Sequence, residues 1–492
     1  MGSNSASRWN AVRQGGNMFG ALAMVLAVTG CGGGSGESNG TPVVVSPSPT
    51  PSSSPTPTSS NCSLSARQDW ARSVLSEWYL FPDLIDSDVR KSDYNDLQSY
   101  IDALVAPAYQ QEKDRGWTYL TSIEEEEAYY SSGSTQGFGM LLVFEDSINR
   151  LRVREAFENA PAFAAGIDRG TEILAAGRTA ESMKLIADMN NDELIDALLP
   201  DDGSSRVIRF MTREPVAGEY TFQKTITPAD YNIEPLSPRY GYRVFSDRFG
   251  KTGYIHLRSF IGPAEDSLRE AFRDMGEQGV DRIMIDVRYN GGGLVRTANI
   301  LADLMNKGRE GQLWSRLELR NSKSANNEDF LFGVEAHALS PDKIAFIATD
   351  SSASASELIM NGQIPYSGGD TVLVGTNTYG KPVGQYAFDL EACDDRLRVV
   401  TFRTVNADGN ADYFGGMASA MPNTCAARDN LDYPLGSLLE TLVLDAQAWL
   451  NYGTCYPPIT ATAGTQATRS VRRKVPMPKQ PNIAQIETPG LF

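Results

Sequence analysis

Residues 343–363 read KIAFIATDSSASASELIMNGQ and join a strongly apolar run to a segment of small residues. The apolar run at 343–348 is typical of a β-strand that is buried on both faces. The serines and alanines that follow it are expected to enter a helix that continues to Gln363. A serine at such a junction can use main-chain N–H groups at the start of the helix to stabilise a developing oxyanion.

A second buried strand is predicted at residues 282–287, RIMIDV, and three consecutive glycines, Gly291 to Gly293, follow it closely. Glycines let the backbone turn tightly and direct bare N–H groups at a ligand. Strands and helices alternate from Lys251 onward, which predicts an α/β layer architecture. The sequence has neither the spaced glycines of a dinucleotide site nor the Lys-Ser/Thr pair of a phosphate-binding loop at this point. We therefore expect no cofactor.

The composition is that of a globular chain. Of 492 residues, 41% are hydrophobic, which is enough apolar mass for about three domains and excludes a wholly disordered or fibrous chain. The net charge of -17 would repel phosphate backbones, so we expect no nucleic-acid partner. The chain has two histidines, His256 and His337. This scarcity argues against a histidine metal site and leaves little room for a histidine base.

The N-terminal segment has the pattern of an export signal. Arg8 and Arg13 precede an apolar stretch at 18–28, which is too short for an ordinary transmembrane helix. The sequence VTGC, ending at Cys31, resembles the lipobox of bacterial lipoproteins. The resemblance implies that residues 1–30 are a removed signal peptide and that lipid on Cys31 holds the protein to a membrane.

Residues 31–61 are rich in Gly, Ser, Pro and Thr, a composition that suits a tether and cannot bury a core. Four cysteines follow it, and an even count in an exported chain favours disulfides, with three possible pairings. Sequence proximity alone favours Cys393–Cys425 and Cys62–Cys455. Free buried thiols are the alternative.

Residues 62–135 are expected to form a helical region, because apolar residues recur there at three- and four-residue steps. Ser122 with the acidic run 124–127 is typical of a capped helix start. We expect these four glutamates to form a solvated helix face.

Short strands punctuated by glycines are predicted from 136 to 230. The segments PAFAAGI at 161–167 and GTEIL at 170–174 resemble a PDZ domain of the bacterial type; an unrelated small β domain is the alternative. The resemblance implies a loop whose N–H groups bind the terminal carboxylate of a peptide, while the adjacent strand pairs with that peptide. The residues in this loop are Gly137, Phe138, Gly139 and Met140.

Three motifs follow the PDZ-like region in a characteristic order. They are DVRYNGGG at 286–293, SASASE at 352–357 and TYGKPVGQ at 378–385. Together they resemble the S41 serine peptidases, the carboxyl-terminal processing or tail-specific proteases, over roughly residues 64–450. The resemblance implies an α/β multidomain fold, with a ClpP/crotonase-like α/β peptidase core at 231–456 into which the PDZ-like domain is inserted.

The same resemblance assigns roles to individual residues. Ser354 is the expected nucleophile, Lys381 its base, and Gln385 the residue that orients the lysine amine. The oxyanion would be held by N–H groups of Ala355, Gly292 and Gly293. Tyr379, Pro382 and Gly384 depart from the family pattern and leave open where Lys381 lies relative to Ser354.

A lysine base suits a chain with so few histidines. Burial disfavours the ammonium and can lower a lysine pKa from about 10.4 toward roughly 7–8, so that a neutral amine accepts the serine proton. The neighbouring Ser352 and Ser356 are interpreted as structural. No metal is expected.

The sequence thus predicts a lipid-anchored Ser/Lys endopeptidase of the bacterial cell envelope, facing the periplasm or exterior. Its expected substrates are polypeptides with apolar C-termini. A non-catalytic peptide- or ligand-binding lipoprotein with the same fold is the main alternative, and glycan or envelope binding is another. Residues 457–492 are expected to be a basic, disordered tail, and their final residues PGLF suggest binding to the chain's own PDZ-like groove. The oligomeric state stays open.

Overall fold

The computed structural model describes residues 62–145, 150–200, 202–214, 218–460, 473–479 and 481–492. The predicted signal peptide 1–30, the tether 31–61 and the lipidation site Cys31 lie outside these ranges. The described residues belong to one compact unit, 59–492. None of the helices in these ranges has the length and apolar character that crossing a membrane requires.

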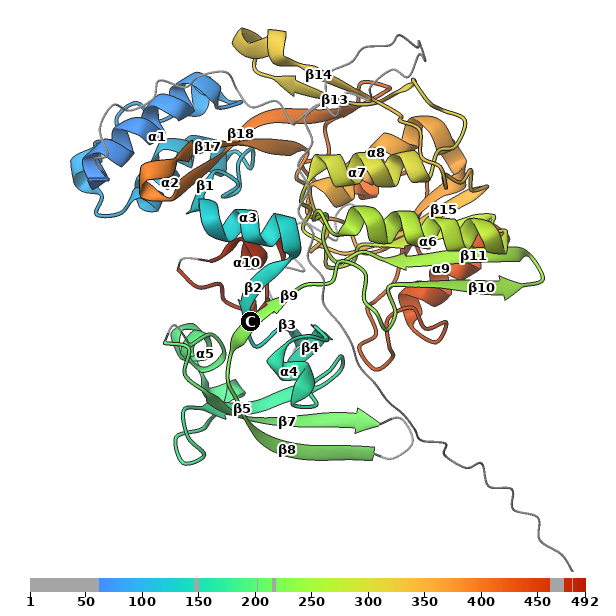
Figure 1. Ribbon diagram of the computed structural model, residues 1–492, viewed down its shortest axis with the longest axis horizontal. Helices are drawn as coiled ribbons and strands as arrows, with labels where there is room; N and C mark the ends of the chain where they lie inside the picture. Colours follow the sequence, from blue (N-terminus) through green and yellow to red (C-terminus); the bar gives the residue numbers. More distant parts are fainter. Residues whose placement is uncertain (1–61, 146–149, 201, 215–217, 461–472, 480) are drawn as a thin grey trace, which may run out of the picture. The chain divides into compact units, whose positions relative to one another are not determined.

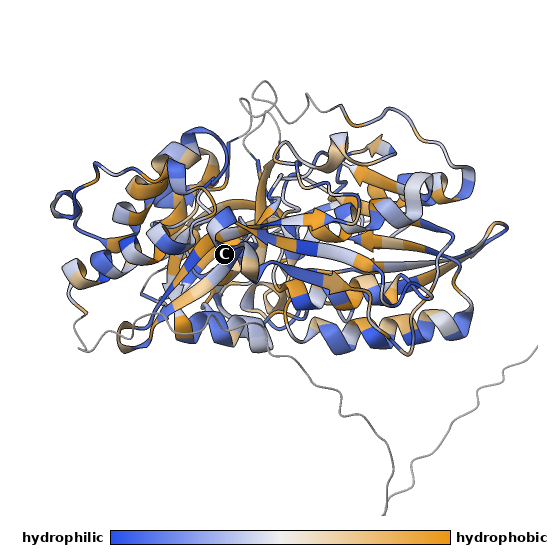
Figure 2. Cartoon of the chain, turned by 90° about the horizontal axis from the view of Figure 1, so that it is seen from above, coloured by the Kyte–Doolittle hydropathy of each residue, from blue (hydrophilic) through white to orange (hydrophobic). Residues whose placement is uncertain are grey.

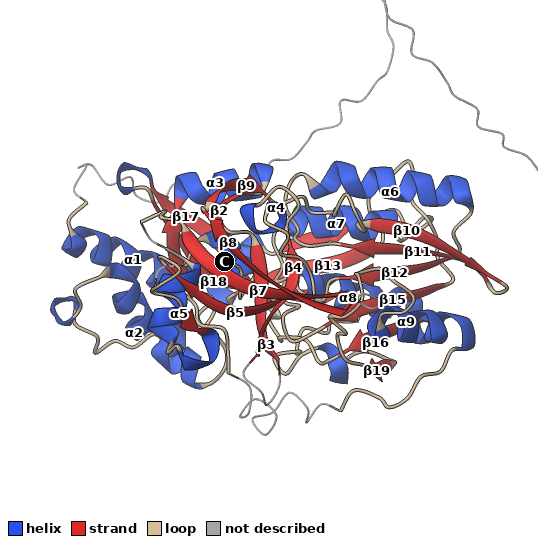
Figure 3. Cartoon of the chain, turned by 90° about the horizontal axis from the view of Figure 1, so that it is seen from below, coloured by secondary structure: helices blue, strands red, loops and turns tan. Residues whose placement is uncertain are grey.

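A six-stranded sheet lies at the centre of the predicted core (Figure 1). All neighbouring strands are parallel except the β10–β11 hairpin. Figure 3 shows the strands side by side. In sheet order they are β10 (Tyr242–Asp247), β11 (Gly250–His256), β12 (Arg282–Asp286), β15 (Lys343–Ala348), β16 (Thr371–Gly375) and β19 (Thr424–Ala426).

Helices cover both faces of this sheet. Alternate residues of a strand point to opposite faces, so Ile283 and Ile285 share a core with α6 (Ala264–Gln278), α7 (Val295–Leu304) and α8 (Ala355–Ser367). Met284, between them, packs with α9 (Thr441–Tyr452) on the other face. The predicted α/β layer architecture is confirmed. Figure 2 shows the hydrophobic residues concentrated along the strands.

A second sheet joins the N-terminal region to later parts of the chain. Its order is β1 (Tyr119–Ser122), β18 (Asp395–Asn406), β13 (Leu313–Leu319) and β14 (Glu328–Leu331), and β17 (Val383–Leu390) also pairs with β18. Helices α1 (Leu64–Trp78) and α2 (Leu97–Gln110) share a hydrophobic core with β17 and β18. The helices predicted within 62–135 are therefore built onto the strand that follows Lys381.

Helix α3 (Ile123–Ser132) begins as predicted, with Ser122 Oγ accepting from Glu125 N–H. The prediction of four solvated glutamates is wrong for Glu126, which is fully buried and pairs with Arg396 and Arg398 of β18. Two cations in a neighbouring strand offset the cost of burying this carboxylate, and the local sequence carries no sign of them.

The region predicted to be PDZ-like forms its own antiparallel sheet. The strands in order are β3 (Met140–Glu145), β4 (Arg150–Ala156), β5 (Glu172–Gly177), β7 (Arg206–Glu214) and β8 (Gly218–Ile226), with β6 (Lys184–Leu185) paired to β5. Helices α4 (Pro161–Ala164) and α5 (Asn191–Leu198) accompany it. The chain enters and leaves through a two-stranded ribbon of β2 (Ser134–Gly137) and β9 (Ala229–Asn232). This arrangement is that of an inserted unit.

Buried ion pairs join this inserted unit to the core. Arg169, close after α4, pairs with Asp429, which also pairs with Arg288. Arg288 is fully buried and contacts the carboxylates of Asp286 and Glu440 as well. Because removing one partner of such a network leaves an uncompensated charge, these residues hold the start of the glycine segment in a defined position.

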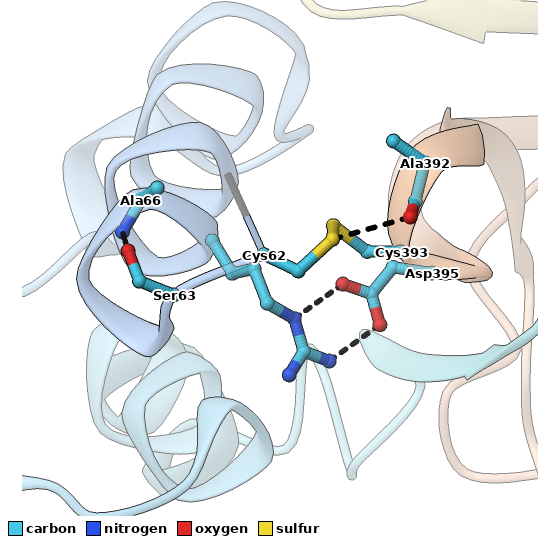
Figure 4. The surroundings of a disulfide bond; sticks show 7 residues. Cys62, Ser63, Ala66, Ala392, Cys393 and Asp395 are labelled. Atoms are coloured by element: carbon cyan, nitrogen blue, oxygen red, sulfur yellow. Dashed lines mark hydrogen bonds and ion pairs between the residues drawn. A yellow bond between two sulfur atoms is a disulfide. The ribbon is translucent and has the colours of Figure 1, made fainter. Parts of the chain in front are cut away.

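The disulfide pairing predicted from sequence proximity is wrong. The bonds are Cys62–Cys393 and Cys425–Cys455, with Cα atoms 5.5 and 5.7 Å apart. Figure 4 shows the first bond, which ties the start of α1 to the turn before β18 and lies beside an ion pair between Arg67 and Asp395. Packing α1 onto β18 brings Cys62 to Cys393, although 331 residues separate them.

The expectation of a disordered tail is wrong for its final part. Residues 483–487 form the short helix α10 (Ile483–Glu487), with Asn482 and Gln485 making a capping box. Leu491 and Phe492 are buried. The remaining short helices are 3-10 turns, at Pro82–Leu84, Lys91–Asp93, Ile186–Asp188, Asn321–Asn326, Gly368–Asp370, Glu391–Cys393 and Met417–Ser419.

Candidate active site

Ser354 lies between strand β15 and helix α8, at the junction anticipated from sequence. Its φ of 53° and ψ of -113° are unusual for a residue other than glycine. Such strained positions cost roughly 1–3 kcal/mol and persist where the surroundings over-determine them, which is common at active sites. The following residue, Ala355, opens α8.

The buried carboxylate of Glu357 accepts hydrogen bonds from the main chain at both Ser354 and Lys381. Its Oε2 atom accepts from the N–H groups of Ser354, at 3.1 Å, and Lys381, at 2.7 Å. Its Oε1 atom accepts from Gly380 N–H and Thr378 Oγ1, both at 2.6 Å. Burial raises the pKa of Glu357, and these four donors oppose that shift. Sequence analysis placed Glu357 in the serine motif but gave it no role, and the positioning role emerges only from these contacts.

Lys381 lies just before β17 and is 8% exposed. Burial lowers the pKa of its ammonium from the ordinary value of 10.5, and the carboxylate of Glu487 is the main charge that opposes the shift. A lysine with a lowered pKa is available as a neutral base nearer to neutral pH. Its Nζ atom lies 5.9 Å from the centre of the Trp117 ring.

Gln385 does not contact the lysine amine as the sequence analysis expected. Its Nε2 atom donates to the Trp117 carbonyl at 2.8 Å, and a register shift at Gly384/Gln385 marks a bulge in β17. Among the described residues, no hydrogen bond joins Lys381 Nζ to Ser354 or to Gln385. Hydrogen bonds between catalytic groups are often long before substrate binds, and the roles of Ser354, Lys381 and Gln385 stay predictions.

Arg115, in the N-terminal region, contacts residues 378–382, which we call the lysine loop. Its guanidinium lies over the Tyr379 ring at 4.4 Å and the Trp117 ring at 4.9 Å. It also donates to the carbonyls of Tyr379, at 2.8 Å, and of Gly380. Sequence analysis missed Arg115 and Trp117, since no local motif marks them.

The glycine segment lies against the serine. A methyl group added at Gly292 would lie 2.8 Å from Ser354 Cβ, so only glycine fits there. The Gly292 N–H donates to Asn290 Oδ1 at 2.9 Å. The Gly291 N–H instead donates to the main-chain carbonyl of Glu487, at 3.1 Å. The oxyanion role of Ala355, Gly292 and Gly293 stays a prediction, and Gly291 is a further candidate because its N–H already donates to a carbonyl oxygen.

A large cleft lies next to Ser354, and Ala353 is part of its lining. It has a volume of about 2630 Å³, and its lining includes Trp117, Lys381 and Gly291. It extends to Leu142 of β3 and to Glu487 of the C-terminal segment. The loop at 137–140 lies at the start of β3, where the N–H groups of Gly139 and Met140 donate to the main-chain oxygen of Phe492, at 2.7 and 3.0 Å.

Comparison with known proteins shows similarity in the core region. Residues 251–417 match the model of peptidase family S41. The chain is 27% identical over 253 residues to carboxyl-terminal-processing peptidase 3 of Arabidopsis thaliana chloroplasts, and 24% identical over 264 residues to a carboxyl-terminal-processing protease of Picosynechococcus. These alignments cover 51% and 53% of this chain, and 46% and 58% of the relatives. The chain therefore spans about half the length of the curated relatives it matches.

A solved structure is similar in fold to the matched segment and its surroundings. The crystal structure of a Bacteroides fragilis protein assigned to the S41 proteases superposes with a TM-score of 0.62. The match covers 78% of this chain and 97% of that one, at 22% identity. It shows the fold alone, and it supports the predicted multidomain α/β architecture beyond the segment that the family model covers.

The polar residues next to Ser354 have structural partners. Ser352 Oγ donates to the Val287 carbonyl at 2.7 Å, and Ser356 Oγ donates to the Asn290 carbonyl at 2.9 Å. Both serines thereby attach the start of α8 to the segment after β12. His256 is buried at the end of β11, and burial lowers its pKa. In the described ranges, no group of three or more His, Cys, Asp or Glu side chains could hold a metal ion.

Glu357→Ala is expected to lower the free energy of unfolding by about 4 kcal/mol or more. The reason is that each buried donor left without an acceptor costs about 1–3 kcal/mol, and the carboxylate serves four donors. Urea unfolding monitored by fluorescence measures the change. Glu277→Ala, at an exposed position on α6, is the matched control and should stay within about 0.5 kcal/mol. Equal effects of the two substitutions would contradict the bracing role of Glu357.

Proposed function

We propose that this protein is a serine endopeptidase in which Ser354 is the nucleophile and Lys381 the base. The observation that carries the proposal is the shared carboxylate of Glu357, which accepts from the main-chain N–H groups of both residues. A strained serine at the start of a helix and a buried lysine are thereby held to the same carboxylate, and Lys381 lines the adjacent cleft. The family match supports peptidase chemistry at this place.

The proposed steps use Lys381 and Gly291, which line the cleft, and Ser354 and Ala355, which follow the lining residue Ala353. Neutral Lys381 accepts the proton of Ser354 Oγ as the oxygen attacks the carbonyl carbon of the scissile bond. The N–H groups of Ala355 and Gly291 stabilise the negative charge on the carbonyl oxygen, and loss of one such donor typically costs about 3–4 kcal/mol. Protonated Lys381 then gives its proton to the leaving amine. Water, deprotonated by the same lysine, hydrolyses the acyl-enzyme and frees Ser354.

Lysine suits this role because burial has already lowered its pKa. The rotation that would bring its Nζ atom to Ser354 Oγ is assigned to substrate binding, since the two are not hydrogen-bonded to each other in this arrangement. Gln385 and Arg115 act indirectly in this proposal, because they fix Trp117 and the lysine loop.

Substrate recognition is assigned to the PDZ-like region. The loop of Gly137, Phe138, Gly139 and Met140 would bind the carboxylate of a polypeptide's C-terminus, and β3 would add the polypeptide as a further strand. The relatives named as carboxyl-terminal-processing enzymes are consistent with this specificity. Phe138 and Met140 are buried in the hydrophobic core of the region, which favours an apolar terminal side chain.

We further propose that lipid on Cys31 attaches the protein to a bacterial membrane on its periplasmic or exterior side. The two disulfides support an oxidising environment. The acidic net charge of -17 does not favour attraction to anionic lipid by the folded part, so the anchor carries the membrane attachment.

Covalent labelling tests the proposed nucleophile. A fluorophosphonate is expected to modify the full chain, and peptide mass spectrometry should place the adduct on Ser354 alone. Lys381→Ala should slow labelling by about 100-fold or more, because general base catalysis typically contributes 10²–10⁴-fold. Lys184→Ala, at an exposed position on β6, is the control and should label normally. An adduct on another serine, or labelling that is indifferent to Lys381, would overturn the proposal in favour of a non-catalytic binding protein.

A further inference from the structure

Residues 482–492 connect the two functional ends of the cleft. They contact the glycine segment beside Ser354 through Glu487 and the loop at 137–140 through Phe492. Helix α10 lies beside α3, and Tyr130 of α3 donates to Glu487 Oε1 at 3.2 Å (Figure 1). The C-terminal segment therefore follows the path that a substrate would take under the proposed function.

At the PDZ-like end, the segment binds as an added strand. The Phe492 main-chain oxygen accepts from Gly139 and Met140, and Phe492 N–H donates to the Met140 carbonyl at 3.0 Å. Leu142 N–H donates to the Gly490 carbonyl at 2.9 Å, and Leu491 forms an antiparallel bridge with Leu141. The Phe492 side chain is 2% exposed and packs with Phe138 and Met140. This is the pairing expected of a bound peptide.

Near Ser354, Glu487 interacts with two groups that the proposed reaction needs, Gly291 N–H and the Lys381 amine. Its carbonyl accepts from Gly291 N–H, and a methyl group added at Gly291 would lie 2.0 Å from this oxygen. Its side chain is 8% exposed, and its carboxylate is the strongest charged influence on Lys381. A carboxylate beside the lysine favours the ammonium, which cannot accept the serine proton.

The conformation of the segment argues that it blocks the site and is not cleaved. Thr488 N–H donates to the Ala484 carbonyl at 2.8 Å, so the Glu487–Thr488 peptide bond lies in a closed helical turn. The capping box of Asn482 and Gln485 stabilises that turn. A peptide bond held in this way is not aligned for attack, whereas a productive bound geometry places the reacting atoms in line.

We propose that residues 482–492 are a tethered inhibitor that occupies the peptide-binding loop and the site beside Ser354 at once. A polypeptide with an apolar C-terminus would activate the enzyme by displacing Phe492 from the loop at 137–140. Covalent attachment gives the segment an effective concentration on the order of millimolar, so only a substrate that competes at that loop gains access. The inference rests on the proposed peptidase function and assigns its regulation to the same cleft.

A shortened chain that stops after Pro481 provides the first test. Its kcat/KM for an unfolded polypeptide with a C-terminal Leu-Phe is expected to exceed that of the full chain by about tenfold or more, and a synthetic peptide of residues 482–492 should inhibit it competitively. Circular dichroism first establishes that the shortened chain is folded, because Leu491 and Phe492 are buried. Equal activity of the full and shortened chains, with no inhibition by the peptide, would overturn the inference.

Point variants of the full chain test the same inference without relying on the shortened chain to fold. A methyl group at Gly490 would lie 2.8 Å from the Leu142 carbonyl oxygen, at a φ of 98° that disfavours side chains. Gly490→Ala should therefore release the segment and activate the full chain. Phe492→Asp should do the same, whereas Phe249→Asp, at an exposed phenylalanine, should leave activity unchanged. Activity of Gly490→Ala and Phe492→Asp no higher than that of Phe249→Asp would overturn the inference.

Binding separates failure of this inference from failure of the proposed function. The Ser354→Ala form of the shortened chain should bind a fluorescent peptide of residues 482–492, and the same peptide with Asp at position 492 should bind at least tenfold more weakly. If the peptide binds but neither the full chain nor the shortened chain with Ser354 cleaves the polypeptide, the peptidase proposal is overturned and the occupation of the loop still holds. If the polypeptide is cleaved but the peptide does not bind, only the inhibitor proposal is overturned.

Discussion

Replacing Ser354 with alanine is expected to lower kcat for polypeptide cleavage by roughly 10⁴-fold or more. The substitution removes the atom that forms the acyl-enzyme, while the oxyanion donors and the binding groove remain and support a small residual rate. The free energy of unfolding should change by less than about 1 kcal/mol, because alanine accepts the same strained backbone at the same cost. Initial rates of release of a fluorescent C-terminal fragment, together with urea unfolding, measure both quantities.

Ser356→Ala is the matched control from the same motif. The Ser356 hydroxyl is buried and donates to the Asn290 carbonyl at 2.9 Å, so its loss should cost roughly 1 kcal/mol of stability and little of the chemical step. The two variants are therefore expected to differ: Ser354→Ala should lose activity and keep its stability, whereas Ser356→Ala should lose stability and keep its activity. A Ser354→Ala variant that cleaves at the wild-type rate would remove Ser354 from the mechanism.

Replacing Lys381 with methionine is expected to lower kcat by about 10²–10⁴-fold, the usual contribution of a general base. Stability should stay equal or rise, because a buried ammonium costs solvation free energy that an apolar side chain of similar length does not. Lys184→Met, at an exposed position, serves as the control. A large stability loss in Lys381→Met would instead assign the lysine a structural role.

The pH dependence follows from the direction of the lysine pKa shift. Activity should rise with pH through an apparent pKa below 10.5, because burial disfavours the ammonium. Glu487, Asp114 and Glu357 raise this pKa, whereas Arg398 lowers it. Since the folded pKa is below the unfolded one, stability should fall as pH drops from about 10.5 through the folded value, and Lys381→Met should abolish that decline.

The substitution Glu487→Gln tests the effect of Glu487 on the Lys381 pKa separately from the effects of the other charged residues. In the resting full chain it removes the largest electrostatic contribution that favours the ammonium, so the pH profile of kcat/KM, which reports the free enzyme, should move to lower pH. Measurements of kcat/KM between pH 5 and pH 10 give the shift, and Glu277→Gln provides the control for loss of one exposed carboxylate. A profile that is unchanged, or moved to higher pH, would contradict an electrostatic influence of Glu487 on the proposed base Lys381.

Local sequence patterns were enough to predict several strands and helix starts of the core, because these depend on neighbours within a few residues. The apolar run at 343–348 became β15, and the small residues after it became the Ser354 junction and α8. Ser122 capped α3 as expected. The scarcity of histidine likewise pointed to a lysine base, since composition needs no knowledge of the fold.

Which distant groups meet depends on how the elements pack together. The pairing of Cys62 with Cys393 depends on α1 packing against β18, and the burial of Glu126 depends on two arginines in that strand. The partners of the glycine N–H groups also depend on the fold, since Gly292 N–H donates to Asn290 and Gly291 N–H donates to Glu487 of the distant C-terminal segment. Local patterns carry the periodicity of one element, whereas contacts between elements depend on how their faces pack.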